Sequence, residues 1–362
     1  MEPGKDHQAQ PVARQGHVVS ATSLSLDVAA VDRWMTANAP GYRGPLTAER
    51  FSGGQSNPTY RLITPGASYV LRRKPPGPLL KGAHAVEREA RVMSALGRQG
   101  FPVPRIIGLC EDVEVIGSAF YVMELVEGRI FWDATFPQVG AADRPAYFDA
   151  MNATLAQLHS IDPTATGLGD YGRAEGFFRR QIARWSDQYR ADAPLAGTSA
   201  EMERMIERLS QTIPPEEPAA ITHGDFRCDN MIFHPTEPRV IAVLDWELST
   251  LGSALGDFAY HLMMYRMPAQ IVAGLRGADL TALNIPNEAD YVAAYARRTG
   301  RDGIQNLDFY NAFNLFRFAG IVHGIRARVA RGTAASANAA EMAAHFETLA
   351  ALGWEETQKI AD

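Results

Sequence analysis

The sequence predicts a bilobal α+β protein, with a β-rich N-terminal lobe followed by a helical C-terminal lobe. Strand-length apolar segments separated by glycine and proline dominate the chain up to residue 127. From residue 128 onward, apolar residues recur with helical spacing. The chain has 362 residues, which suffices for two domains of about 150 residues each. We therefore expect a mobile tail at 1–22, an N-terminal lobe at 23–127 and a C-terminal lobe at 128–362.

The N-terminal lobe is expected to hold two helices and four strands. Asp27 precedes an amphipathic stretch and suits the N-cap of a helix that ends before Pro40. A second helix is expected over 84–98, where small and apolar residues share one face. The strands are apolar and bounded by turn residues such as Pro65. They are expected at 59–64, 68–73, 105–110 and 119–126.

The C-terminal lobe is expected to be mainly helical. The segment 143–159 shows the pattern clearly, because Tyr147, Met151 and Leu155 fall on one helical face. The same periodicity recurs at 199–211, 254–265, 288–298, 306–330 and 338–359. Two short apolar strands lie among these helices, at 231–233 and 240–244. A β-rich lobe followed by a helical lobe is an α+β arrangement.

Charge and composition exclude several classes of protein. The chain has 35 basic and 41 acidic residues, and its net charge of −6 argues against nucleic acid as a general partner. No apolar run approaches the roughly 18 residues of a membrane span, and the N-terminus lacks the apolar core of a signal peptide. Cys110 and Cys228 are too few for a disulfide framework. We expect a cytoplasmic protein with neither a membrane nor a nucleic-acid partner.

The densest group of candidate functional residues lies in the middle of the helical lobe. Four polar residues fall within eight positions there, namely His223, Asp225, Asp229 and Asn230. Asp245 follows at the end of an apolar strand. Asn230 and Asp245 offer oxygen atoms, and Mg²⁺ binds one or two protein carboxylates together with water and phosphate. The other interpretation is that all five are turn and cap residues.

The spacing of these residues resembles that of a kinase catalytic set. The loop reads His223-Gly-Asp225-x-x-x-x-Asn230, and Asp245 follows Asp225 by twenty residues. Over roughly residues 45–330, the chain resembles the aminoglycoside phosphotransferase family, the small-molecule branch of the protein-kinase-like fold. It also resembles the kinase-like domain fused to some acyl-CoA dehydrogenases. The resemblance implies ATP- and Mg²⁺-dependent phosphorylation of a small-molecule hydroxyl, with Asp225 at the acceptor and Asn230 and Asp245 at magnesium.

The resemblance also implies a loop over the ATP phosphates, within Phe51-Ser-Gly-Gly-Gln-Ser-Asn57. Gly53 and Gly54 would let backbone N–H groups approach phosphate oxygens closely. Ser56 and Asn57 would add hydrogen-bond donors. An ordinary hairpin turn is the alternative interpretation of the two glycines.

A cation at the end of the third strand is the next feature that the resemblance implies. Arg72 stands where the family usually has a phosphate-binding lysine, and Arg73 or Lys74 takes that place if the register slips. An arginine can still hold phosphate oxygens and accept a carboxylate partner. Glu89 is the expected partner of Arg72, and Glu87 is the alternative. A solvated strand arginine is the alternative.

Three further positions follow from the same resemblance. Backbone groups around Glu124 and Val126 would bind adenine at the hinge between the lobes. Asp257 would brace the catalytic loop near His223, which is then an orienting residue rather than a proton carrier. His159 is interpreted as structural.

Three other functions remain open at the level of sequence. A metal-dependent phosphoesterase would use His223, Asp225, Asp229 and Asp245 and need no nucleotide, although such sites usually contain more histidines. A non-catalytic nucleotide-binding module is disfavoured by the intact Asp and Asn set. A protein kinase is disfavoured by the short stretch between Asp245 and Asp257.

The sequence does not identify the acceptor beyond a hydroxylated small molecule. An antibiotic and a hydroxyacyl metabolite fit the resemblance equally. A cationic antibiotic would favour an acidic pocket, and the C-terminal lobe holds acids such as Glu288, Asp290 and Glu341. Arg317 and His323 are further candidates for the acceptor pocket.

Overall fold

The computed structural model describes residues 26–51, 57–75, 84–271, 273–334 and 338–361. The expected tail at 1–22 and the expected loop residues Gly53, Gly54 and Ser56 lie outside these ranges. The chain divides into two compact units, and the described part of the first comprises 26–51, 57–75, 84–90 and 106–125. The second unit comprises 91–105 and the chain from 126 onward. The sequence places one boundary after residue 127, whereas the compact units assign 91–105 to the helical unit.

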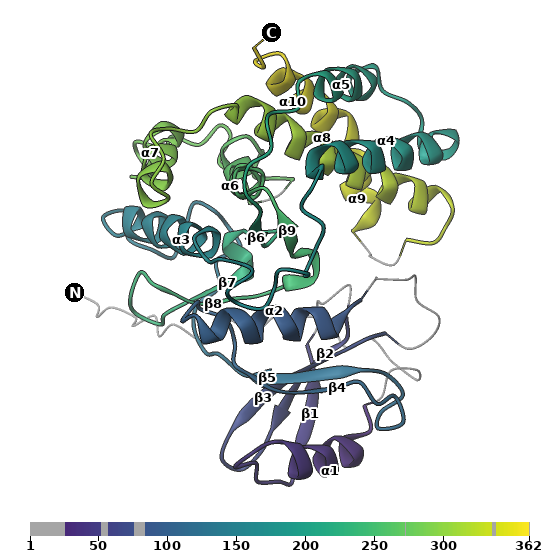
Figure 1. The fold of residues 1–362 in the computed structure, drawn as a ribbon, viewed down its shortest axis with the longest axis vertical. Coiled ribbons are helices and arrows are strands. Elements are labelled where there is room, and N and C mark those ends of the chain that lie inside the picture. The colour runs from purple at the N-terminus through teal and green to yellow at the C-terminus, as the bar shows by residue number, and fades with distance from the viewer. Residues whose placement is uncertain (1–25, 52–56, 76–83, 272, 335–337, 362) are drawn as a thin grey trace, which may run out of the picture. The chain divides into compact units, whose positions relative to one another are not determined.

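The first unit is built on a five-stranded antiparallel sheet (Figure 1). Its strands are β1 (Thr47–Arg50), β2 (Thr59–Ile63), β3 (Ser68–Arg73), β4 (Ile106–Cys110) and β5 (Phe120–Glu124), in the order β1-β2-β3-β5-β4. Strand β1 was not predicted, because three of its four residues are exposed and it lacks an apolar pattern. The other four strands match the predicted segments closely.

The first unit contains helix α1 and the beginning of helix α2. Helix α1 (Val28–Asn38) begins at Asp27, whose Oδ1 accepts a hydrogen bond from the Ala30 N–H at 2.9 Å. Its Val31 packs in a core cluster with Leu71 of the sheet. Helix α2 (Val86–Arg98) begins in the first unit and continues into the second. Because side chains alternate along a strand, Leu71 faces α1 and its neighbour Arg72 points to the opposite face.

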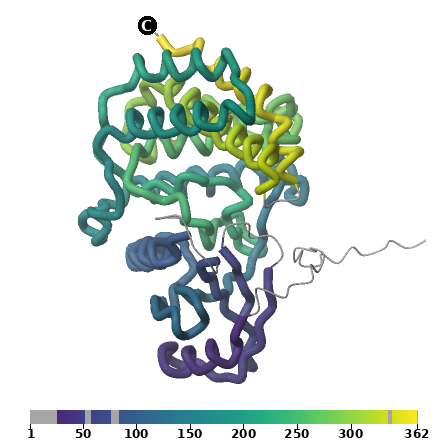
Figure 2. Tube along the Cα trace, turned by 90° about the vertical axis from the view of Figure 1, so that its right-hand side faces the viewer, coloured from purple at the N-terminus to yellow at the C-terminus, as the bar shows by residue number. Residues whose placement is uncertain are grey.

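The second unit is mainly helical, as predicted. Its helices are α3 (Arg144–His159), α4 (Phe177–Ala196), α5 (Ala200–Gln211), α6 (Ala254–Leu262), α7 (Glu288–Arg298), α8 (Leu307–Ala330), α9 (Ala339–Ala344) and α10 (Phe346–Thr357). The buried helix α8 packs against α4, α6, α9 and α10 (Figures 1 and 2). A 3-10 turn, η3 (Met263–Tyr265), extends α6 to the predicted end. The predicted helix at 338–359 is divided at His345 into α9 and α10.

Helix α4 is the largest element that the sequence did not predict. It is rich in arginine and polar residues, and Pro194 lies inside its last turn. The many charged and polar residues leave few apolar positions to mark a helical face, and proline is unfavourable in a helix interior. Its buried side chains, including Phe178, Ile182 and Tyr189, become a recognisable face only once α8 lies beside them.

Two short ladders hold the loops that carry the candidate site. Strand β6 (Ala220–Thr222) pairs with β9 (Thr250–Gly252), and β7 (Met231–Phe233) pairs with β8 (Val240–Val243). The loop 223–230 runs from β6 to β7, and the loop 244–249 runs from β8 to β9. Both loops therefore connect the same two ladders and lie side by side. No helix among the described residues is long and apolar enough to cross a membrane.

Candidate active site

Asp257, in the first turn of α6, anchors the loop 223–230. Its Oδ2 accepts the His223 backbone N–H at 2.7 Å, and its Oδ1 accepts the Gly224 N–H at 2.8 Å. The His159 Nε2 also lies 3.2 Å from Oδ2. Burial by itself would raise the pKa of Asp257, but the hydrogen bond and the charge interaction with His159 hold this pKa below its usual range. The geometry is the bracing arrangement expected for Asp257.

Replacing Asp257 by Asn should lower the free energy of unfolding by about 3 kcal/mol, because buried donors lose a charged acceptor. A carboxylate with a depressed pKa stabilises the fold fully above its ordinary pKa of 3.8 and loses that contribution as pH falls further. Urea unfolding should show the difference between wild type and variant at pH 7, and the difference should shrink below pH 3.8. The exposed Asp302→Asn variant is the control. A difference that is constant with pH would contradict this role.

His223 is fully buried, and both of its ring nitrogens have partners. Its Nε2 donates to the Leu244 carbonyl at 2.8 Å, and its Nδ1 accepts the Asp225 backbone N–H at 3.2 Å. The ring therefore links the loop 223–230 to the loop 244–249. Both nitrogens are engaged within the protein, which favours the orienting role over proton transfer or metal binding.

Glycine is required directly before Asp225. Gly224 has a φ of +82°, and a Cβ there would lie 2.8 Å from the Leu248 carbonyl oxygen. A side chain at this position would therefore strain the backbone and collide with the loop 244–249.

Asp225 is held by hydrogen bonds to both carboxylate oxygens. The Asn230 Nδ2 donates to Oδ2 at 2.9 Å, and the Tyr260 hydroxyl donates to Oδ1 at 2.5 Å. The Arg227 Nε lies 3.8 Å from the same Oδ1. Tyr260 and Arg227 are absent from the sequence-based site. Tyr260 could have been found from the sequence, because it lies three residues after Asp257 in a predicted helix. Residues three apart are neighbours on one helix face.

Asn230 and Asp245 are brought together by backbone pairing. The Leu244 N–H donates to the Asn230 backbone carbonyl at 2.8 Å. Asp245 is the next residue after Leu244, so this hydrogen bond holds it close to Asn230. The Asn230 Nδ2 also donates to the Asp225 backbone carbonyl at 2.9 Å. Because the amide N–H₂ serves Asp225, the Asn230 side-chain oxygen is the atom suited to a cation. Asp245 has a φ of 64°, a left-handed conformation that is uncommon for residues other than glycine and often marks a functional site.

The Asn230 side-chain oxygen and the Asp245 carboxylate fit magnesium, which prefers oxygen ligands and takes few of them from the protein. In the described ranges, no three His, Cys, Asp or Glu side chains lie close enough together to hold a metal ion. The phosphoesterase interpretation needs His223, Asp225, Asp229 and Asp245 as such a group. His223 is instead committed to the backbone, and both Asp229 oxygens are bonded to Arg227.

Arg227 and Cys228 lie in the same loop. Burial lowers the pKa of Arg227, but Asp225 and Asp229 raise it further, so its net direction is upward and the guanidinium stays charged. Burial raises the pKa of the Cys228 thiol to about 12. The thiol is therefore protonated near neutral pH and is not a nucleophile.

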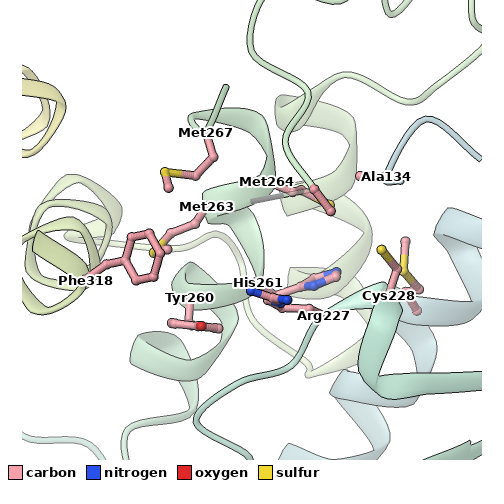
Figure 3. Close-up of a pocket in the computed structure, with 11 residues that line it drawn as sticks. Ala134, Arg227, Cys228, Tyr260, His261, Met263, Met264, Met267 and Phe318 are labelled. Carbon is pink, nitrogen blue, oxygen red and sulfur yellow. The ribbon is translucent and has the colours of Figure 1, made fainter. Parts of the chain in front are cut away.

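An apolar pocket adjoins the loop 223–230 (Figure 3). Its walls come from α6, η3 and several loops, with one residue each from α3 and α8. They comprise Ala134, Met151, Arg227, Cys228, Tyr260, His261, Met263, Met264, Met267, Ala273 and Phe318. None of these residues is acidic. A methionine-rich wall is adaptable and suits an apolar ligand.

The polar residues that the sequence suggested for an acceptor pocket do not line this one. Glu288 pairs with Arg266 at 2.5 Å, and the Asp290 carboxylate accepts a hydrogen bond from Asn287, the N-cap of α7. His323 donates from Nε2 to the Gly197 carbonyl at 2.9 Å, away from the pocket walls. His323 is therefore not among the residues that line this pocket.

His261 lines the pocket, and Arg317 contacts the lining residue Tyr260. The Arg317 guanidinium donates to the Gly224 carbonyl at 3.3 Å and lies over the Tyr260 ring, 5.4 Å from its centre. The His261 Nδ1 donates to the Phe226 carbonyl at 3.1 Å. Burial lowers the pKa of His261 to about 4, so the imidazole is neutral at pH 7. Both side chains tie the pocket wall to the loop 223–230.

In the first unit, Arg72 and Glu89 form the expected ion pair. The Arg72 Nε lies 3.1 Å from Glu89 Oε2. The Tyr121 hydroxyl donates to Glu89 Oε2 at 3.1 Å, and the Asn57 Nδ2 donates to Oε1 at 3.1 Å. The Asn57 side chain is buried, and its Oδ1 accepts from His84 Nδ1 at 3.0 Å. Asn57 thus supports Glu89, which differs from the phosphate contact expected from the sequence.

The other two cations near the end of β3 have different partners. Arg73 is buried and donates to the loop 116–118 through Nε and Nη2, both at 2.9 Å. Lys74 pairs with Glu87 at 2.8 Å. Strand alternation therefore selects Arg72 as the partner of α2.

The expected hinge falls at the boundary of the two units. Glu124 is the last residue of β5 and pairs with Tyr69, whereas Val126 belongs to the second unit.

The sequence matches the phosphotransferase enzyme family over residues 47–310. It is 43% identical over 316 residues to acyl-CoA dehydrogenase family member 10 of Mus musculus, covering 86% of this chain and 29% of that protein. It is 42% identical over 344 residues to acyl-CoA dehydrogenase family member 11 of Gallus gallus, covering 92% of this chain and 44% of that protein. The chain thus spans less than half of each relative.

Solved structures show the same fold. A Ralstonia eutropha protein provisionally described as an aminoglycoside phosphotransferase is 46% identical, with a TM-score of 0.85 over 93% of this chain and 100% of that chain. An aminoglycoside phosphotransferase in complex with AMP-PNP and hygromycin B has a TM-score of 0.60 at 15% identity, over 90% of this chain and 98% of that chain. The second likeness concerns the fold alone. The expected protein-kinase-like α+β fold is confirmed.

Proposed function

The chain belongs to the phosphotransferase enzyme family, and on this premise we propose that it transfers the terminal phosphoryl group of ATP to a hydroxyl of a small molecule. The observation that carries the proposal is the arrangement around Asp225. Asp257 braces the loop, Asn230 binds one Asp225 oxygen and Asp245 follows the backbone bond to Asn230. These are the parts that phosphoryl transfer needs, since its catalysis is mostly positioning and electrostatics.

In the second unit, Asp225 is proposed to orient the acceptor hydroxyl and to accept its proton. Its carboxylate is partly exposed, at 24%, and its orientation is fixed by hydrogen bonds. Asn230 and Asp245 are proposed to hold Mg²⁺ through side-chain oxygens. When bound, the ion would neutralise charge on the phosphate oxygens.

In the first unit, Arg72 is proposed to bind phosphate oxygens. Glu89 orients the guanidinium, and Asn57 and Tyr121 hold Glu89. The backbone at Glu124 to Val126 is the proposed adenine contact. For Gly53, Gly54 and Ser56 the phosphate-loop role is a proposal from the sequence alone.

The acceptor is proposed to carry its hydroxyl on an apolar group. The pocket beside Asp225 is lined by methionine, phenylalanine and alanine, and its one formal charge is the cation Arg227. Such a wall is unsuited to a polycationic aminoglycoside. Curated relatives are named as acyl-CoA dehydrogenases, so a hydroxyacyl compound is the acceptor class that the pocket and these names favour together. A cytoplasmic location is proposed from the sequence.

A panel of hydroxylated compounds with MgATP is expected to give phosphorylated products from apolar and acyl-chain alcohols but not from aminoglycosides. Product formation, followed by ³¹P NMR and by ATP consumption, tests this directly. Omission of Mg²⁺ should abolish turnover. Transfer to an aminoglycoside at a rate above that for acyl alcohols would contradict the proposed acceptor class.

The same measurements separate the alternatives. A non-catalytic module would bind MgATP without consuming it. A phosphoesterase would release phosphate from a phosphorylated compound in the absence of nucleotide.

A further inference from the structure

Tyr260 belongs to two features of the second unit at once. Its hydroxyl donates to Asp225 Oδ1 at 2.5 Å, and the residue is one of those that line the apolar pocket (Figure 3). It comes from α6, the helix that also carries Asp257. The residue therefore connects the pocket wall to the carboxylate.

We propose that Tyr260 is a positioning residue that holds Asp225 Oδ1 in the orientation needed to receive the acceptor hydroxyl from the pocket. This inference rests on the proposed phosphotransferase function.

The environment of Tyr260 suits it to this task. The ring is buried, and Arg317 lies over it with its guanidinium 5.4 Å from the ring centre. Arg317 also bonds to the Gly224 carbonyl, so the same side chain ties the ring to the catalytic loop. Burial, followed by the nearby charge of Asp225, raises the pKa of the Tyr260 hydroxyl. The hydroxyl therefore remains a donor near neutral pH.

The hydrogen bond matters because Asp225 has a competing partner. The Arg227 Nε lies 3.8 Å from the same Oδ1 that Tyr260 binds. Without the Tyr260 hydroxyl, the Arg227 guanidinium has no competitor from the phenol at that oxygen and draws the carboxylate toward itself. A small rotation of a reacting group away from its productive geometry can lower a rate about a hundredfold.

The test is Tyr260→Phe, which removes the hydroxyl and keeps the ring. With MgATP and water as the acceptor, release of inorganic phosphate should show kcat reduced about 10- to 100-fold and an unchanged KM for MgATP. Tyr265→Phe is the matched control, because it also removes a phenol hydroxyl bonded within the protein, in this case to the Pro286 carbonyl at 2.9 Å. The control should keep the wild-type kcat. A Tyr260→Phe enzyme with wild-type kcat would overturn the inference.

A double-mutant cycle shows whether Tyr260 acts through Asp225. In an Asp225→Ala background, Tyr260→Phe should reduce the rate no further. An equal additional loss in that background would mean that Tyr260 has an independent structural role, and would overturn the inference while leaving the proposed function intact.

Absence of any phosphate release by the wild-type protein, with water or with the alcohol panel, would instead count against the proposed function. In that case the Tyr260→Phe and Asp225→Ala cycle is measured on the folding equilibrium constant, by urea unfolding. Tyr260→Phe should lower the folding equilibrium constant about tenfold in the wild type, and markedly less in Asp225→Ala. Equal losses in both backgrounds would show that the hydroxyl does not hold Asp225, and would overturn the inference.

Discussion

Asp225→Asn is expected to reduce phosphoryl transfer about a hundredfold or more, the usual scale for a positioned acid–base group. The change keeps the shape of the side chain and removes its charge and basicity. Affinity for MgATP should change much less, because the proposed magnesium ligands are Asn230 and Asp245. The amide can still accept from Tyr260, so the fold of the loop should persist.

Initial rates with an acceptor from the alcohol panel, or with water, provide the turnover, and calorimetric titration provides the MgATP affinity. Asp302→Asn, an exposed aspartate of the same unit, is the matched control and should behave as wild type. Loss of MgATP binding with near-normal turnover at saturation would instead assign Asp225 to the nucleotide.

Asp245→Asn is expected to lower MgATP turnover by about a hundredfold, because a bound metal contributes several kcal/mol to phosphoryl transfer. The substitution is well suited to the site. Asp245 has a left-handed backbone with φ at 64°, and asparagine is among the few residues that adopt this conformation readily. The fold should therefore be retained while the carboxylate charge is lost.

The rate should be measured as a function of Mg²⁺ concentration, with circular dichroism to verify the fold. The variant should need a higher Mg²⁺ concentration for half-maximal rate. If the variant has the wild-type rate and the wild-type Mg²⁺ dependence, Asp245 does not hold the metal.

Much of the architecture could be predicted because the relevant patterns are local. Helical periodicity located α3, α7 and α8, and turn residues delimited β2 and β3. The spacing of Asp225, Asn230 and Asp245 along the chain identified the loops 223–230 and 244–249 as the candidate site. In the structure, the two short ladders hold these loops together. Elements without a strong apolar pattern, β1 and α4, escaped prediction because packing partners rather than their own sequences stabilise them.

The family, the two-lobed α+β order and the polar loop residues were thus determined by the sequence itself. The sequence named Arg72 and Glu89 as partners but left Arg73 and Lys74 open, and the tertiary structure decided among the three cations, since the choice depends on which face of β3 each side chain occupies. The tertiary structure also decided that Tyr260 binds Asp225 across 35 positions of the chain, and that methionines form the adjacent pocket wall. Contacts of this kind join residues far apart in sequence, and the packing of whole elements sets them rather than any local pattern.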